Sequence, residues 1–87
     1  MATRTAAHYD AWYSTERGAW IGEQELRLLT QQLRLQSGDN LLDVGCGTGW
    51  FTRRFARLSG VSVTGIDINP QWLAFARQRD AATDYVQ

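Results

Sequence analysis

Apolar residues recur along the first half of the chain at a spacing typical of an amphipathic helix. Leu26, Leu29 and Leu33 lie three or four positions apart, as residues on one helical face do. The pattern predicts a helix over residues 20–35, with acidic residues in its first turns and Gly38 after its end.

Short apolar runs then alternate with further helical spacing. Residues 41–44 (LLDV) are nearly all apolar and predict a strand of the kind that a parallel sheet covers on both faces. Residues 50–58 return to helical spacing, and we expect this helix to stop at Ser59 and Gly60. Its basic residues are interpreted as a solvated face: Arg53, Arg54 and Arg57.

The second half of the chain continues the alternation. Four apolar positions predict a second buried strand that ends at Asp67: Val61, Val63, Ile66 and Ile68. Asn69 is a favourable N-cap and Pro70 suits the first helical position, so a helix is expected from there to about Arg79. A third strand is expected near Asp84.

This order of elements predicts an α/β fold. Parallel strands joined by helices cross over in one hand, so we expect the N-terminal half of a Rossmann-like doubly wound parallel sheet, with about three strands and flanking helices. Residues 1–19 are polar and aromatic without a clear period. They are predicted to form an N-terminal arm before a partial domain of residues 20–87.

The stretch GCGTG follows the first predicted strand directly. Gly45, Gly47 and Gly49 allow a tight turn and close approach of a ligand to bare backbone N–H groups at a helix start. Asp67 ends the next strand, where a carboxylate can accept hydrogen bonds from both hydroxyls of a ribose. Ligands of such sheets bind beyond the carboxyl ends of the strands, so the glycine turn and Asp67 together predict a nucleoside site.

Two common nucleotide motifs fit the stretch poorly. A dinucleotide fingerprint beginning at Gly45 would need Gly or Ala at position 50, which is Trp50 here. An NAD-type module therefore stays only as an alternative. A phosphate-binding P-loop needs a lysine, and the chain contains none.

Asp43 is an acidic residue inside the first apolar strand. A buried carboxylate is costly unless it is paired or hydrogen-bonded. Two interpretations stay open: a structural carboxylate bonded to the amides of the glycine turn, or a direct or water-mediated contact to an ammonium group of the ligand.

The segments LLDVGCGTG and GIDINP resemble motif I and the adjoining acidic-strand motif of class I S-adenosylmethionine-dependent methyltransferases. The resemblance is closest to the small-molecule type related to quinone-biosynthesis enzymes. It is strong over residues 39–72 and loose over the preceding helix and the arm. It implies S-adenosylmethionine as the cofactor and transfer of its methyl group to a small-molecule acceptor.

The resemblance also implies roles for individual residues. The glycine turn would pack against the methionine part of the cofactor, and Asp43 would help to hold its amino group. Asp67 would bind the ribose hydroxyls, and Ile68 would pack on the adenine. Trp50 is then permitted, since this cofactor has no pyrophosphate.

Two further residues are assigned to the cofactor site. Cys46 has no evident base nearby, and a small residue is common there in the family, so we expect a backbone contact and no nucleophile. His8 and Tyr9 lie in an arm of the kind that closes over the cofactor in similar enzymes. We select Tyr9 as the capping residue, and a plain surface role is the alternative.

The sequence departs from the family in where it stops. Complete members continue the sheet beyond the third strand, and their acceptor-binding and catalytic residues lie there, so no catalytic residue is predicted and the chain alone is expected to be inactive. The open edge of the first strand predicts either a fragment of a longer enzyme or pairing with another copy. A non-catalytic nucleotide-binding or self-assembling module is the alternative function.

Composition narrows the remaining classes. The chain has 87 residues with 44% hydrophobic content and four tryptophans, which indicates one small packed unit. Nine basic and nine acidic residues balance to zero net charge, so nucleic acid is not an expected partner. The chain has a single cysteine and no signal-like start, which predicts a cytoplasmic protein. It has no apolar run of about 20 residues, so no membrane span is predicted. No metal site is predicted.

Overall fold

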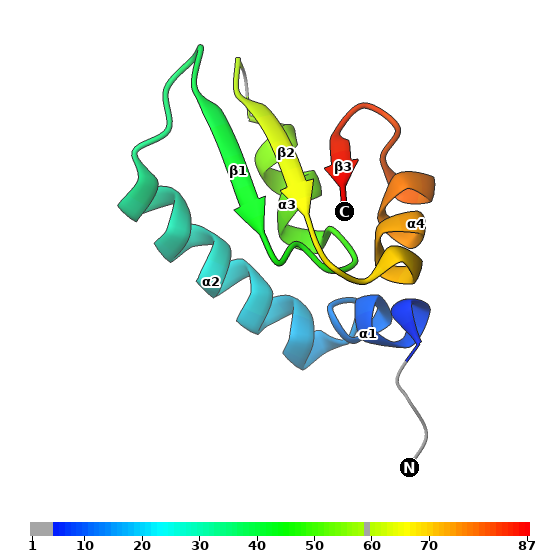
Figure 1. The fold of residues 1–87 in the computed structure, drawn as a ribbon. Coiled ribbons are helices and arrows are strands. Elements are labelled where there is room, and N and C mark those ends of the chain that lie inside the picture. Colours follow the sequence, from blue (N-terminus) through cyan, green and yellow to red (C-terminus); the bar gives the residue numbers. More distant parts are fainter. Residues whose placement is uncertain (1–4, 59) are drawn as a thin grey trace.

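The computed structural model describes residues 5–58 and 60–87, so residues 1–4 of the predicted arm and the predicted stop at Ser59 lie outside it. Figure 1 shows the order of elements. They are α1 (Ala6–Trp12), α2 (Glu16–Leu33), β1 (Asn40–Val44), α3 (Trp50–Ala56), β2 (Ser62–Ile66), α4 (Pro70–Arg79) and β3 (Asp84–Val86).

The strands form one parallel sheet in the order β1-β2-β3 (Figure 1). In its register Asp43 pairs with Gly65, and Gly65 with Tyr85. The predicted α/β class with three parallel strands and flanking helices is therefore confirmed. Because β1 and β2 are parallel neighbours, with Val44 opposite Ile66, their carboxyl ends lie side by side.

Local capping explains where the helices begin. Asn69 accepts hydrogen bonds from the N–H groups of Gln71 and Trp72, so α4 starts at Pro70 as predicted. The predicted start of α2 at residue 20 was wrong. Thr15 caps this helix by accepting from the Gly18 N–H, so it begins four residues earlier, before its leucine period starts.

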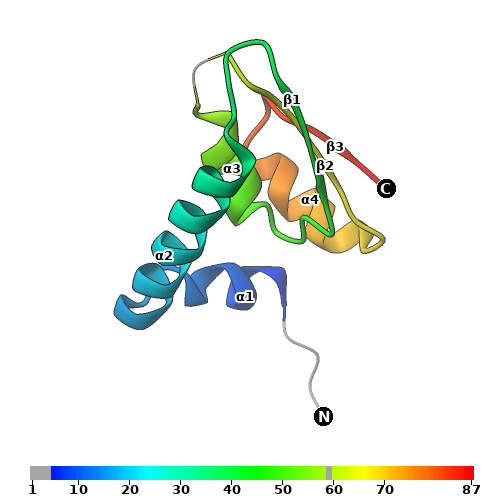
Figure 2. The same ribbon diagram turned by 90° about the vertical axis from the view of Figure 1, so that its left-hand side faces the viewer.

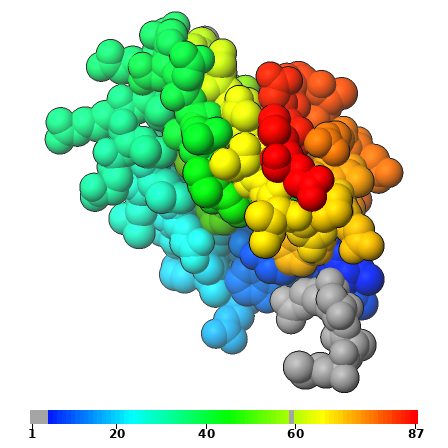
Figure 3. Space-filling view, viewed as in Figure 1, coloured from blue at the N-terminus to red at the C-terminus, as the bar shows by residue number. Residues whose placement is uncertain are grey.

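The helices cover only one face of the sheet, as the edge-on view in Figure 2 shows. The predicted burial of β1 on both faces was wrong. The strand order rises steadily from β1 to β3, so successive crossovers of one hand place α3 and α4 on the same face. Leu42, Val44 and Val86 are exposed on the other face, which lies at the front of Figure 3.

The core lies between the sheet and its two crossover helices. Leu73 and Ala76 of α4 are fully buried and pack with Tyr85 of β3. Phe55 of α3 and Val63 of β2 are also buried. This core lies directly beneath the turn that follows β1, and therefore supports the turn.

The long helix α2 packs less closely than its sequence pattern predicts. Leu29 and Leu33 of its leucine face stay exposed, while Gly18 and Gly22 are its buried residues. A methyl group on Gly22 would lie 2.6 Å from the Trp50 ring, so a glycine is needed for this contact. Within residues 5–58 and 60–87, no helix combines the length and apolar character that crossing a membrane requires.

Candidate cofactor site

The turn from β1 to α3 is built around three glycines with left-handed backbone conformations. Gly45 has φ of 75°, and a methyl group there would meet nothing within 4 Å. Gly49 differs, since a methyl group there would lie 2.9 Å from the Tyr85 hydroxyl and 3.1 Å from Cβ of Ala76. Gly45 therefore borders open space that a ligand can approach, whereas Gly49 is required by the packing beneath it.

The backbone N–H groups of this turn are mostly occupied within the chain. The amides of Gly45 and Cys46 both donate to the carbonyl of Ile66, at 2.8 and 3.0 Å. The Gly47 amide donates to Asp67, and the Gly49 amide to the Cys46 carbonyl. The prediction that these four amides are bare was therefore wrong. Three of them are occupied because the turn folds back onto the end of β2, and the Gly49 amide is occupied by a bond within the turn.

Asp67 follows β2 and has both carboxylate oxygens anchored. Its Oδ2 accepts from the Gly47 amide and its Oδ1 from the Asn69 amide, each at 2.9 Å. Each carboxylate oxygen has a second acceptor position. Asp67 can therefore still accept hydroxyl donors from a ligand while its orientation is fixed by the backbone.

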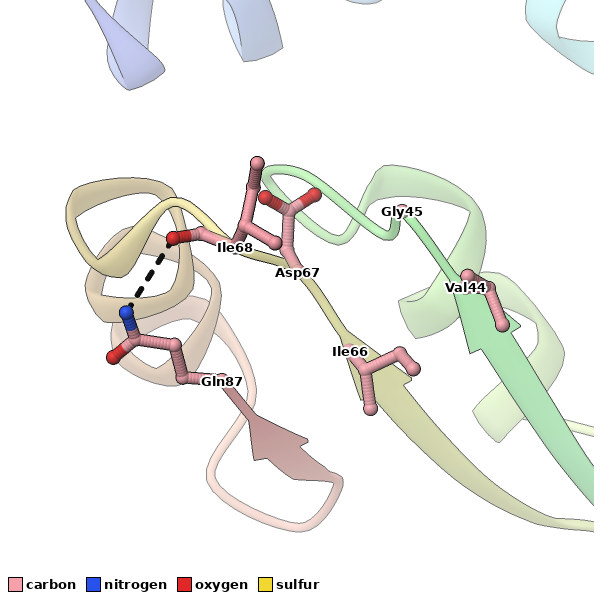
Figure 4. A pocket seen from close by; sticks show the side chains of 6 residues that line it. All are labelled: Val44, Gly45, Ile66, Asp67, Ile68 and Gln87. Atoms are coloured by element: carbon pink, nitrogen blue, oxygen red, sulfur yellow. Dashed lines mark hydrogen bonds between the residues drawn. The ribbon is translucent and has the colours of Figure 1, made fainter.

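Two hollows flank the turn, and Gly45 and Asp67 line both of them. The first, of about 290 Å³, lies toward the open sheet face and is drawn in Figure 4; its other lining residues are Val44, Ile66, Ile68 and Gln87. Ile68 is 91% exposed there, although the sequence pattern predicted that it would be part of the buried strand. It follows the end of β2 and is free to contact a flat ligand.

The second hollow, of about 350 Å³, lies beneath α1. It brings together several aromatic side chains, the glycine turn and two acidic residues: Tyr9, Tyr13, Trp50, Phe51, Trp72, Gly45, Cys46, Gly47, Thr48, Asp67 and Glu25. Of the predicted site residues, all but Asp43 and Gly49 line one of the two hollows.

Tyr9 lies on α1, which lies below the start of α4 in Figure 1. Its ring packs on Trp72 of α4 with centroids 4.7 Å apart. One turn further along the chain, Tyr13 stacks on Trp50 at 4.5 Å. The arm is therefore attached to both α3 and α4 by aromatic contacts, which hold Tyr9 over the second hollow.

Asp43 lies on the helix-covered side of β1 and is half-buried. The Thr52 hydroxyl of α3 donates to its Oδ2 at 2.7 Å. Burial raises the pKa of Asp43, and this hydrogen bond acts in the opposite direction. The partner of the carboxylate is thus a threonine hydroxyl and not the turn amides that one sequence interpretation predicted; contact with a ligand ammonium stays a prediction.

We expect Asp43→Asn to unfold at a higher urea concentration than the unmodified chain at about pH 7. Between pH 3.8 and its raised pKa, the Asp43 carboxyl binds more protons in the folded chain than in the unfolded chain. Its ionisation therefore lowers the free energy of unfolding. The advantage of asparagine should shrink as the pH falls through the folded pKa toward 3.8. Asp84→Asn, at an exposed position of β3, is the control. Equal stability of the Asp43→Asn variant and the unmodified chain at neutral pH would contradict the expected cost.

Cys46 packs against the sheet beside two carboxylates. A methyl group on Gly65 would lie 2.9 Å from its Sγ. Burial and the charges of Asp43 and Asp67 raise the pKa of the Cys46 thiol to about 11. The side chain is therefore a protonated thiol at neutral pH, which is a poor nucleophile.

Sequence reasoning missed a polar cluster that joins the arm to the turn. Arg53 of α3 donates to the Thr48 carbonyl at 2.7 Å and pairs with Asp10 of α1 at 2.9 Å. The Thr48 hydroxyl donates to the same carboxylate oxygen at 2.8 Å. The side chains of Arg53 and Asp10 are only 12% and 15% exposed. No local pattern reveals a pair so far apart in the sequence.

The predicted solvated arginine face was therefore wrong for two of its three members. Arg53 belongs to this cluster, and the Arg54 guanidinium lies 3.5 Å from the centroid of the Trp50 ring. Arg57 is exposed, as expected. The first turns of α3 point toward the arm and α2, so arginines there meet aromatic and acidic partners before they reach water.

A family model described as a methyltransferase domain matches residues 41–87, more than half of the chain. The chain belongs to the methyltransferase domain family. The match includes both motifs that carry the sequence resemblance, from the strand before the glycine turn to the end of β3.

Curated relatives of this methyltransferase chain are much longer than it is. A malonyl-[acyl-carrier protein] O-methyltransferase from Serratia marcescens is 40% identical over 84 residues, which are 97% of this chain and 30% of the relative. A demethylmenaquinone methyltransferase from Tropheryma whipplei is 49% identical over 53 residues, 61% of this chain and 22% of the relative. The chain spans less than a third of either protein.

Solved methyltransferase structures share the fold. A SAM-dependent methyltransferase from Geobacter sulfurreducens, in complex with S-adenosyl-L-homocysteine, superposes with a TM-score of 0.61 at 30% identity. The match covers 74% of this chain and 28% of that structure. The Rossmann-like architecture of the sheet and its helices is therefore that of the methyltransferases.

Proposed function

We propose that this chain is the S-adenosylmethionine-binding part of a methyltransferase that acts on a small-molecule acceptor. The observation that carries the proposal is the position of Asp67. Its carboxylate is fixed by two backbone amides at the end of β2, beside a glycine that borders open space. An anchored acceptor of this kind suits the paired hydroxyls of a ribose.

The other predicted site residues surround that point. Ile68 would pack on the adenine, and Tyr9 would cap the cofactor from α1. The glycine turn and Cys46 would border the methionine part, and Asp43 would receive its amino group. When bound, the cofactor supplies a methyl group on a sulfonium; the residues of this chain bind and orient it.

We propose further that the chain is part of a longer cytoplasmic protein and is inactive alone. It spans 30% of its Serratia relative, and it leaves the edge of β1 and one apolar sheet face uncovered. Further strands and helices would cover both. Pairing with a second copy through the β1 edge is the alternative way to cover that edge. Comparing the intact mass of the protein with the length of its gene distinguishes a piece of a longer protein from a chain that pairs with its own copy.

Equilibrium dialysis with labelled S-adenosylmethionine tests the cofactor assignment. We expect the label to be retained and to be displaced by excess S-adenosylhomocysteine. The alternative of a non-catalytic or NAD-type module would be supported instead if no label were retained, or if NAD displaced it as well as S-adenosylhomocysteine.

A further inference from the structure

Thr52 is a fully buried polar side chain that the predicted site does not include. It lies in the first turns of α3, and its hydroxyl donates to Oδ2 of Asp43 at 2.7 Å. Valine has nearly the same shape, so packing alone does not account for a hydroxyl at this position. The hydroxyl therefore needs a separate explanation.

The Thr52 hydroxyl bonds to another element and not to the backbone of its own helix. A threonine hydroxyl inside a helix commonly donates back to the carbonyl four residues earlier. Thr30 of α2 does so, with its hydroxyl 2.7 Å from the Leu26 carbonyl. The corresponding carbonyl for Thr52 is that of Thr48, which accepts from Arg53, and the Thr52 hydroxyl points across to β1.

The bond fixes one oxygen of Asp43 and leaves the other available. Among the residues that the structure describes, every fully buried side-chain nitrogen or oxygen has a hydrogen-bond partner. Oδ1 of Asp43 accepts no hydrogen bond from this part of the chain, while Oδ2 is held by Thr52. Oδ1 is consequently not fully buried, although Asp43 itself lines neither of the two hollows.

We infer that Thr52 is a positioning residue, which holds Asp43 so that its Oδ1 meets the amino group of an amino-acid-bearing nucleoside. The inference rests on the proposed function and adds a residue to it. The Thr52 side chain is fully buried, so the surrounding packing holds its hydroxyl in a defined direction. The hydroxyl also donates to the charged form of the carboxylate, which is the form that attracts an ammonium group.

The test compares two ligands that differ in the amino acid part. S-adenosylhomocysteine carries the amino group, whereas 5′-methylthioadenosine keeps the adenosine and sulfur but lacks it. By calorimetry, Thr52→Val should bind S-adenosylhomocysteine about fivefold more weakly, as expected for the loss of one net hydrogen bond, and 5′-methylthioadenosine unchanged. Thr52→Ser keeps the hydroxyl and should bind both as the unmodified chain does.

Thr30→Val is the matched control, because it removes a helical threonine hydroxyl far from the turn. In an Asp43→Asn background, Thr52→Val should have no further effect on S-adenosylhomocysteine. Circular dichroism checks folding, and Thr52→Ala provides the same comparison if the valine variant is unfolded.

The outcomes separate this inference from the proposed function. Equal weakening of both ligands by Thr52→Val, or no weakening of either, would overturn the positioning role while leaving the cofactor assignment intact. Failure of the unmodified chain to bind S-adenosylhomocysteine would overturn the proposed function, and the role of Thr52 with it.

Discussion

Replacing Arg53 by methionine is expected to destabilise the chain by about 3 kcal/mol, near the lower end for breaking a buried ion pair. The guanidinium links α3 to Asp10 of α1 and to the Thr48 carbonyl of the turn. Methionine keeps much of the volume and removes the charge, so Asp10 would be left mostly buried without its cation. Urea unfolding followed by tryptophan fluorescence measures the change.

The same helix offers a matched control for this prediction. Arg57→Met removes an exposed arginine one turn further along α3 and should change stability by less than about 0.5 kcal/mol. The double variant Arg53→Met/Asp10→Asn should recover part of the loss, because it removes both charges. If Arg53→Met unfolded at the same urea concentration as Arg57→Met, the cluster would not hold the arm in place.

Asp67→Ala is expected to weaken cofactor binding by about 1.5 to 3 kcal/mol, through the loss of charged hydrogen bonds to the ribose. At 25 °C this corresponds to a dissociation constant raised about tenfold to more than a hundredfold. Because the carboxylate also accepts from the Gly47 and Asn69 amides, the turn should loosen as well. Calorimetric titration with S-adenosylhomocysteine measures the affinity.

Two variants separate the roles of Asp67. Asp67→Asn keeps an oxygen that can accept one backbone amide, and should bind more tightly than the alanine variant. Asp84→Ala removes an exposed carboxylate at the start of β3 and should bind as the unmodified chain does. A dissociation constant that Asp67→Ala leaves unchanged would rule out the ribose role.

The elements with strong local signals could be predicted from the sequence. Asn69 and Pro70 mark the start of α4, and the glycines mark the end of β1, because caps and turns depend on neighbouring residues. Asp67, the acidic residue that follows β2, was likewise predicted because it comes directly after a strand pattern. These positions contain most of the proposed site.

The remaining features depend on residues distant in the sequence. The partner of Arg53 lies on α1, and the amides of Gly45 and Cys46 are occupied by a carbonyl of β2. Exposure of Val44 follows from both crossover helices lying on one face. Each result is set by tertiary packing, which composition and periodicity do not encode.

The most direct test of the cofactor assignment is a calorimetric comparison of S-adenosylhomocysteine with NAD on the same preparation. We predict saturable binding of S-adenosylhomocysteine to one site per chain, and no comparable binding of NAD. Tight binding of NAD, with none of S-adenosylhomocysteine, would contradict the account.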